Sequence, residues 1–116
     1  MQPEELARSV DTLSSSAAEG GLLARDVARD RTKTTFARVR ARELGEVVDH
    51  EAEKLSDATP QQGIGGEKLA AVQLAEAISQ VLGKIQISPA DRDVAREAER
   101  KLDDLSKRGQ ALSKSL

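Results

Sequence analysis

Apolar residues recur every three or four positions through most of this chain, and that spacing constrains its fold more than any other feature. A period of 3.6 residues places side chains on one face of an α-helix, whereas a half-buried strand needs strict alternation. No segment alternates in that way, and none is rich in β-branched residues. The sequence therefore predicts an all-α protein in which each helix buries one apolar face.

The length and charge of the chain predict one folded domain, residues 1–116. A third of the residues are charged, but the formal net charge is only −2, which favours a folded chain over an extended polyelectrolyte. The core is expected to be aliphatic, because Phe36 is the only aromatic residue. The lack of cysteine excludes disulfides, thiolate zinc sites and cysteine nucleophiles.

The first two predicted helices cover about residues 3–19 and 22–57. Gly20-Gly21 is expected to end the first helix, since two interior glycines cost about 2 kcal/mol relative to alanine. The alternative is one helix that continues through the glycines. The second helix is either unbroken or broken near 31–35, because residues 29–35 contain no apolar side chain. Unbroken, it would reach about 54 Å and outrun its neighbours.

The other two predicted helices cover about residues 67–86 and 89–114, after a loop over 59–66 that is rich in glycine. The third helix has the widest apolar face and few charges, so we expect it to be the most buried. Ser88, Pro89 and Asp91 are typical of a helix start, with serine as the N-cap.

Short connections predict that successive helices are antiparallel, which gives an up-down bundle of four helices. The alternative is a core of three helices with the first helix loosely attached. On the exposed side of the fourth helix, Glu97–Lys101 and Asp104–Arg108 have the i, i+4 spacing of ion pairs.

Charge is strongly segregated in the middle of the chain. Residues 25–42 hold seven bases against two acids, a net +5, and residues 43–57 hold six acids against one base, a net −5. Three hypotheses stay open for the basic part: pairing with acids on a neighbouring helix, contact with phosphates, or antiparallel self-association in which the two halves meet. The seven bases are Arg25, Arg29, Arg31, Lys33, Arg38, Arg40 and Arg42, of which Arg31, Arg38 and Arg42 are expected to share one face.

The sequence carries no pattern of catalytic or metal-binding residues. His50 is the only histidine and follows Glu46 by four residues, whereas a di-iron bundle needs a Glu-x-x-His pair on each of two helices. As a general base, His50 would also need a nucleophile and an oxyanion site, and the sequence indicates neither. We therefore expect a protein that is not an enzyme and has no cofactor.

The chain is expected to be cytoplasmic and to have no contact with a membrane. No apolar run approaches the roughly 18 residues of a membrane span. The first residues are acidic where a signal peptide would be basic.

These features predict a small helical module that binds a protein partner, or a structural module, with another copy of itself as one candidate partner. The seven bases are the candidate site. A second candidate is the apolar stripe of the first helix, which either completes the bundle or is covered by a partner: Leu6, Val10, Leu13 and Ala17. The alternative function is a small nucleic-acid-associated regulator that uses residues 25–42, although no aromatic residues are interleaved there to stack on bases.

Overall fold

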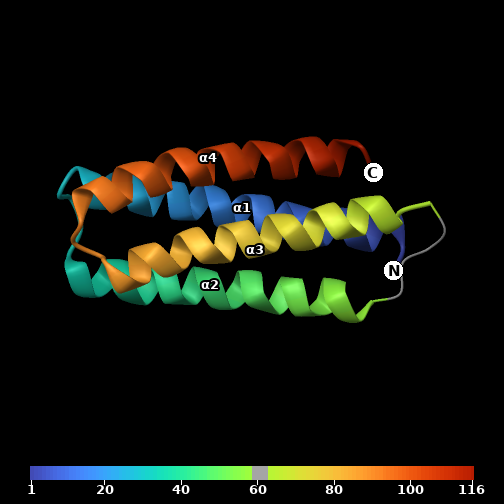
Figure 1. Ribbon diagram of the computed structural model, residues 1–116, viewed down its shortest axis with the longest axis horizontal. Helices are drawn as coiled ribbons and strands as arrows, with labels where there is room; N and C mark the ends of the chain where they lie inside the picture. Colours follow the sequence, from blue (N-terminus) through green and yellow to red (C-terminus); the bar gives the residue numbers. More distant parts are fainter. Residues whose placement is uncertain (59–62) are drawn as a thin grey trace.

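The computed structural model describes residues 1–58 and 63–116, which form four α-helices and, within that part of the chain, no strand. The helices are α1 (Pro3–Ala28), α2 (Thr34–Asp57), α3 (Gly65–Ile87) and α4 (Arg92–Lys114). Successive helices run in opposite directions, and both termini lie at the end of the bundle that holds the α2–α3 connection (Figure 1). The predicted all-α, up-down bundle of four helices is confirmed.

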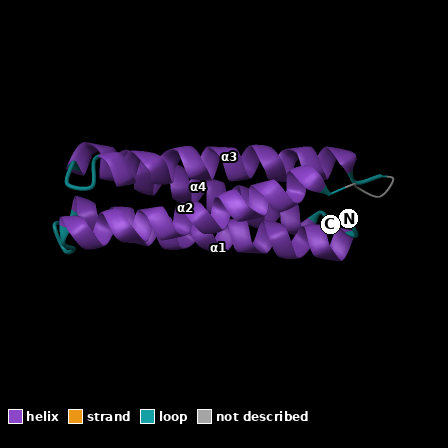
Figure 2. Cartoon of the chain, turned by 90° about the horizontal axis from the view of Figure 1, so that it is seen from below, coloured by secondary structure: helices purple, strands orange, loops and turns teal. Residues whose placement is uncertain are grey.

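The helices form a square in which α1 and α3 each adjoin all three others, while α2 and α4 stand at opposite corners. All four run the length of the bundle, and the connections lie at its two ends (Figure 2). The alternative of a three-helix core with a loose first helix is therefore wrong, because α1 packs most extensively against α4 and also against α2.

The most buried helix is α1 and not α3, which corrects the prediction for the third helix. Twelve residues of α1 are buried, compared with seven of α3. The difference comes from small and polar residues that hydropathy does not count as core, such as Ser9, Ser16 and Gly21. The core itself is aliphatic throughout, with fully buried leucines and isoleucines from all four helices, among them Leu13, Leu55, Ile78 and Leu102.

The first helix does not end at Gly20-Gly21 but continues to Ala28. The predicted boundary at residue 19 is therefore wrong, and the alternative of a helix that continues through the glycines is confirmed. These glycines serve close packing instead. A Cβ atom on Gly20 would lie 2.9 Å from Leu82 Cδ2 and 3.1 Å from Leu102 Cδ1. On Gly21 it would lie 2.7 Å from Asp103 Oδ1. The absence of side chains here lets α1 approach its neighbours closely, and that packing offsets the low helix propensity.

The break near residues 31–35 is confirmed, and it begins slightly earlier. Arg29 caps α1, and Asp30 adopts a left-handed conformation with φ 56°. The Asp30 and Arg31 amides then donate to the carbonyls of Val27 and Asp26, which is the Schellman pattern of helix termination. The second helix therefore starts at Thr34, and its 24 residues match the 23 to 26 of the others. It has no spare length to be covered by a partner.

The last helix begins at Arg92 with Asp91 as its N-cap, so the prediction of Ser88 as the cap is wrong. The Ser88 amide still donates to the Lys84 carbonyl and closes the last turn of α3. Pro89 instead lies in a turn that the Asp91 amide closes by donating to the Ser88 carbonyl (3.2 Å). Asp91 Oδ1 accepts from the Asp93 and Val94 amides at 2.9 and 3.1 Å. In the predicted loop 59–66, residues 59–62 lie outside the described part, and α3 already starts at Gly65.

Small residues also close the seam between α1 and α4. Ser14 Oγ donates to the Ser106 carbonyl (2.8 Å), and Ser106 Oγ donates to the Ser14 carbonyl (3.1 Å). One turn further along α4, a Cβ atom on Gly109 would lie 2.9 Å from Ser14 Cβ and 3.3 Å from Ser14 Cα. The two backbones therefore touch with almost no space for additional atoms.

Candidate functional site

The apolar stripe of α1 lies in the core of the bundle. Its four residues, Leu6, Val10, Leu13 and Ala17, are all 0% exposed. They complete the bundle, and in the folded chain they offer no surface that a partner could cover.

The seven candidate bases do not form one surface. Arg25 and Arg29 are at the end of α1, two more precede α2, and the last three lie on α2. Arg31 precedes the helix, so the expectation that it shares a helical face with Arg38 and Arg42 is wrong. Arg25 is half-buried, and its buried Nε has no hydrogen-bond partner among the described residues.

Arg40 pairs with acids of the bundle itself. Its Nη2 donates to Glu19 Oε2 of α1 at 2.6 Å, and its Nη1 lies 3.7 Å from Glu43 Oε2. This pair ties α2 to α1, as the hypothesis of pairing with a neighbouring helix expects. Five bases are exposed and form no ion pair within the described residues: Arg29, Arg31, Lys33, Arg38 and Arg42.

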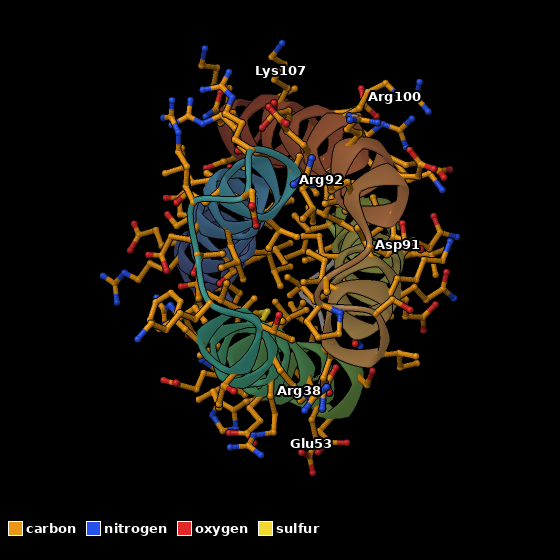
Figure 3. All side chains as sticks on the ribbon, turned by 90° about the vertical axis from the view of Figure 1, so that its left-hand side faces the viewer. Arg38, Glu53, Asp91, Arg92, Arg100 and Lys107 are labelled. Atoms are coloured by element: carbon orange, nitrogen blue, oxygen red, sulfur yellow. The ribbon has the colours of Figure 1, made fainter. Side chains whose placement is uncertain are left out.

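Two of these unpaired bases belong to a longer row of charges on α2. We call this row the outer face of α2 and define it by Arg38, Arg42, Glu46, Asp49 and Glu53. The spacing of three or four residues places all five on one side of the helix, and all five are exposed. Figure 3 shows Arg38 and Glu53 projecting from α2 away from the bundle.

The charges of this outer face are not compensated inside the bundle. Only Asp49 has a partner among the described residues, and that partner is the neutral hydroxyl of Ser79, which donates to Asp49 Oδ1 at 2.7 Å. The ion pairs of α2 use other side chains, Arg40 with Glu19 and Glu43, and Lys54 with Glu51 at 3.6 Å.

The order of charges along α2 also opposes what stabilises a helix. The macrodipole favours acids near the N-terminus and bases near the C-terminus, typically by 0.3–1 kcal/mol each. The first turn of α2 has no acid, and acids dominate its second half. Like charges also stand one turn apart, Arg38 with Arg42 and Asp49 with Glu53, which is unfavourable. The order of charges on α2 therefore favours the helix less than the reverse order would.

Gly45 lies in the middle of this row, three residues after Arg42 and four before Asp49. A Cβ atom there would meet nothing within 4 Å. Close packing within the bundle therefore does not explain this glycine, although a glycine in a helix interior costs about 1 kcal/mol relative to alanine.

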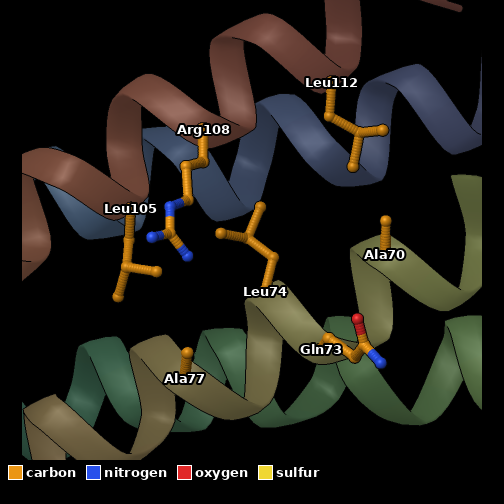
Figure 4. Close-up of a pocket in the computed structure, with 7 residues that line it drawn as sticks. All are labelled: Ala70, Gln73, Leu74, Ala77, Leu105, Arg108 and Leu112. Carbon is orange, nitrogen blue, oxygen red and sulfur yellow. The ribbon is translucent and has the colours of Figure 1, made fainter.

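A groove between α3 and α4 is a second surface feature, and sequence analysis missed it. Its volume is about 250 Å³, and its lining is mainly apolar. Leu74 and Leu105 form the floor, Ala70 and Ala77 line the α3 side, and Arg108 reaches over it from α4 (Figure 4). Two further hollows continue along the same seam towards Lys84. Alanines on the side of α3 that faces α4 leave this space, and that was the only signal in the sequence.

The predicted pairs on α4 are confirmed, and their residues line the groove and the two hollows that continue it. Lys101 Nζ lies 2.9 Å from Glu97 Oε1, and Arg108 Nε lies 3.0 Å from Asp104 Oδ2. The hydrogen bond and the positive charge of Lys101 lower the pKa of Glu97, and Lys84 on α3 adds to this effect. The charges around the groove are thus largely paired, unlike those of the outer face of α2.

The described residues hold no group of three or more His, Asp or Glu side chains that could bind a metal ion. His50 is exposed on α2. Residues 1–58 and 63–116 also include no helix with both the length and the apolar character to cross a bilayer. Comparisons of this chain with protein families, with curated proteins and with solved structures found no match.

Proposed function

We propose that this chain is a non-enzymatic helical module that binds a protein partner through the outer face of α2. The observation that carries the proposal is the row of exposed charges from Arg38 to Glu53, in which bases are followed by acids and no member forms an ion pair within the described residues. The charge order is unfavourable for an isolated bundle, and a complementary surface on a partner would relieve it.

A charged stripe on a helix is usually its solvated side. The ion pairs on α4 of the same chain provide a comparison for the stripe on α2. Four ion pairs on α4 hold Arg92, Arg96, Lys101 and Arg108. Seven of the twelve charged residues of α4 form ion pairs within the described residues, compared with four of the ten on α2, and none of those four belongs to the outer face. A partner would explain why this row stays unpaired.

Site-specific photocrosslinking in cells tests this proposal. A photoreactive amino acid replaces Thr35, which is exposed and lies seven residues before Arg42 on α2. The matched control replaces Gln110, which is exposed on α4. We expect a protein adduct of defined mass at residue 35 that disappears when Arg38 and Arg42 are both changed to alanine. The same adduct at both positions, or one that survives the alanine changes, would contradict the proposal.

The alternative function, a nucleic-acid-associated regulator, is favoured by one observation. Arg29, Arg31 and Lys33 are exposed and unpaired among the described residues, and all three lie in the short α1–α2 turn. Phosphate contacts by such a cluster predict an affinity for duplex DNA or RNA that falls steeply between about 50 and 200 mM salt. A fluorescence anisotropy titration with a labelled duplex measures this, and a flat response or no binding at low salt would exclude the alternative.

A further inference from the structure

We propose that the partner of the outer face of α2 is a second copy of this chain, bound with its α2 antiparallel to the first. This inference rests on the proposed function, and it specifies the partner. In the dimer, Arg42 of each copy faces Glu46 of the other, and Arg38 faces the acids around Asp49 and Glu53. The interface is isologous, so every contact occurs twice.

The charge row itself requires the antiparallel orientation. Its two bases occupy the N-terminal half of α2, and its three acids occupy the C-terminal half. When two such rows cross near residue 44 in opposite directions, each base meets an acid. A parallel copy would place Arg38 against Arg38 and Glu53 against Glu53, which is repulsive.

The charge distribution of the whole bundle favours the same orientation. The half that holds the α1–α2 and α3–α4 turns, residues 16–45 and 77–102, has twelve bases and eight acids. The other half has six bases and twelve acids. Two bundles side by side and antiparallel therefore bring the basic half of each copy next to the acidic half of the other.

Gly45 lies close to the point where the two α2 helices would cross. A glycine there lets two helix backbones approach closely, as Gly20 and Gly109 do for α1 and α4 inside the bundle. The difference is that Gly45 has open space around it within one chain. A second copy supplies the missing neighbour.

Apolar side chains of α2 contribute little to this interface. Phe36, the only aromatic residue of the chain, is 58% exposed, and Val47 is 44% exposed. Both lie on α2, and their spacing of eleven residues places them on one side of the helix. Val39, which belongs to the outward side of the same helix, is only partly exposed. Phe36 and Val47 lie on the side of α2 towards α1, where Val47 lines a hollow with Glu19 and Arg40, so the contact rests mainly on the charge pairs.

A charge-swap experiment tests this dimer directly. The acidic variant carries Arg38→Glu and Arg42→Glu, and the basic variant carries Glu46→Lys and Glu53→Lys. The control variant carries Arg100→Glu and Lys107→Glu on the outward side of α4, which changes the net charge as much as the acidic variant does (Figure 3). Circular dichroism verifies that each variant is folded.

The readout is the molar mass in about 50 mM salt, by size exclusion with light scattering and refractive-index detection, because the chain has no Trp or Tyr. We expect the wild type and the control to have twice the chain mass of 12.5 kDa. The acidic and basic variants each dissociate, with a dimer dissociation constant raised about tenfold or more. An equimolar mixture of the two restores the dimer, since complementary rows then face each other.

The outcomes separate this inference from the function on which it rests. A wild type that is monomeric at low salt overturns the dimer, and so does a dimer that both charge variants retain. If residue 35 then crosslinks to a different protein, the outer face of α2 is still a binding surface and only the identity of its partner was wrong. If residue 35 crosslinks to nothing, both proposals fail.

Discussion

Helices α2 and α4 stand at opposite corners of the bundle and have similar numbers of charged residues, ten and twelve, but they use them differently. The charges of α4 follow the helix dipole. Asp91 caps its N-terminus, Asp93 lies in its first turn, and Lys114 lies in its last turn. Its acids also precede bases by one turn, the better orientation for an ion pair.

Along α2 the bases come first and acids dominate the second half, with Lys54 as the base of the last turn. Lys33 occupies the N-cap position without any side-chain cap hydrogen bond, and no acid lies in the first turn. Packing also differs, because a Cβ atom on Gly109 would lie 2.9 Å from Ser14 Cβ of α1, whereas a Cβ atom on Gly45, as on Gly83 of α3, would meet nothing within 4 Å. Helix α4 thus has more of its charges in ion pairs within the chain, whereas the proposed interface would use the unpaired row of α2 and the open space at Gly45.

The largest expected effects on stability come from replacing Gly109 and Gly45 with alanine, each in a separate variant. Gly109→Ala places a Cβ atom 2.9 Å from Ser14 Cβ, and the backbone of α1 cannot move without disturbing the core. We expect it to lower the free energy of unfolding by about 1–3 kcal/mol. Gly45→Ala meets nothing within the chain and should raise the same quantity by up to about 1 kcal/mol.

Urea denaturation followed by circular dichroism at 222 nm measures both changes. The protein should be dilute and in high salt, so that association through α2 does not contribute. Equal effects of the two substitutions would show that α1 and α4 are not as tightly packed as the distances indicate.

The helix caps provide the next contrast. Asp91→Ala removes the acceptor for two amides of α4 and should cost about 1 kcal/mol. Lys33→Ser instead adds a side-chain acceptor for the first-turn amides of α2. Lys33 already has the extended backbone of an N-cap, and its carbonyl accepts from the Ala37 amide, so a serine there should stabilise the protein by about 0.5–1 kcal/mol.

The same denaturation experiment checks both cap variants, with Ser88→Ala as the control. Ser88 caps the C-terminus of α3 through its backbone amide, which alanine retains, and it is not the N-cap of α4, so its substitution should leave the stability nearly unchanged. If Ser88→Ala lowered the free energy of unfolding more than Asp91→Ala, Ser88 would be the N-cap of α4, as the sequence predicts.

Sequence analysis predicted most of the fold because the apolar period directly reflects burial. The stripes on the four helices, the antiparallel order and the i, i+4 pairs of α4 all follow from spacing alone. Its errors concern residue types that have more than one physical role. Gly20-Gly21 can end a helix or admit a neighbour, and the neighbours that decide this, Leu82 and Leu102, are more than sixty residues away in the sequence.

The candidate site was less predictable for a related reason. The sequence showed where bases and acids are segregated, but not which bases are paired, half-buried or outside the helix. Arg40 is paired with Glu19 across the α1–α2 seam, Arg25 is half-buried, and Arg31 lies before the helix. The groove between α3 and α4 was not predicted, since alanines at Ala70 and Ala77 are compatible with both a filled and an open seam. Three-dimensional packing decides each of these cases.

The smallest expected effect tests whether the charges of α4 are paired in solution. The hydrogen bond and positive charge of Lys101 lower the pKa of Glu97 below its ordinary value. Because the folded-state pKa is depressed, this pair contributes to stability above the ordinary carboxyl pKa, and the contribution is lost as the pH falls through the depressed value. Both side chains are exposed, so only a small part of the stability depends on it.

An NMR titration of the Glu97 carboxyl carbon measures this shift residue by residue. Lys101→Met removes the hydrogen-bond donor and the nearest positive charge, and it should raise the pKa of Glu97 towards the ordinary value. Lys107→Met, a matched change further along α4, should leave the pKa of Glu97 unaltered. If Lys101→Met also leaves the pKa of Glu97 unaltered, the Glu97–Lys101 ion pair does not persist in solution. The charges of α4 would then not be better paired than those of α2.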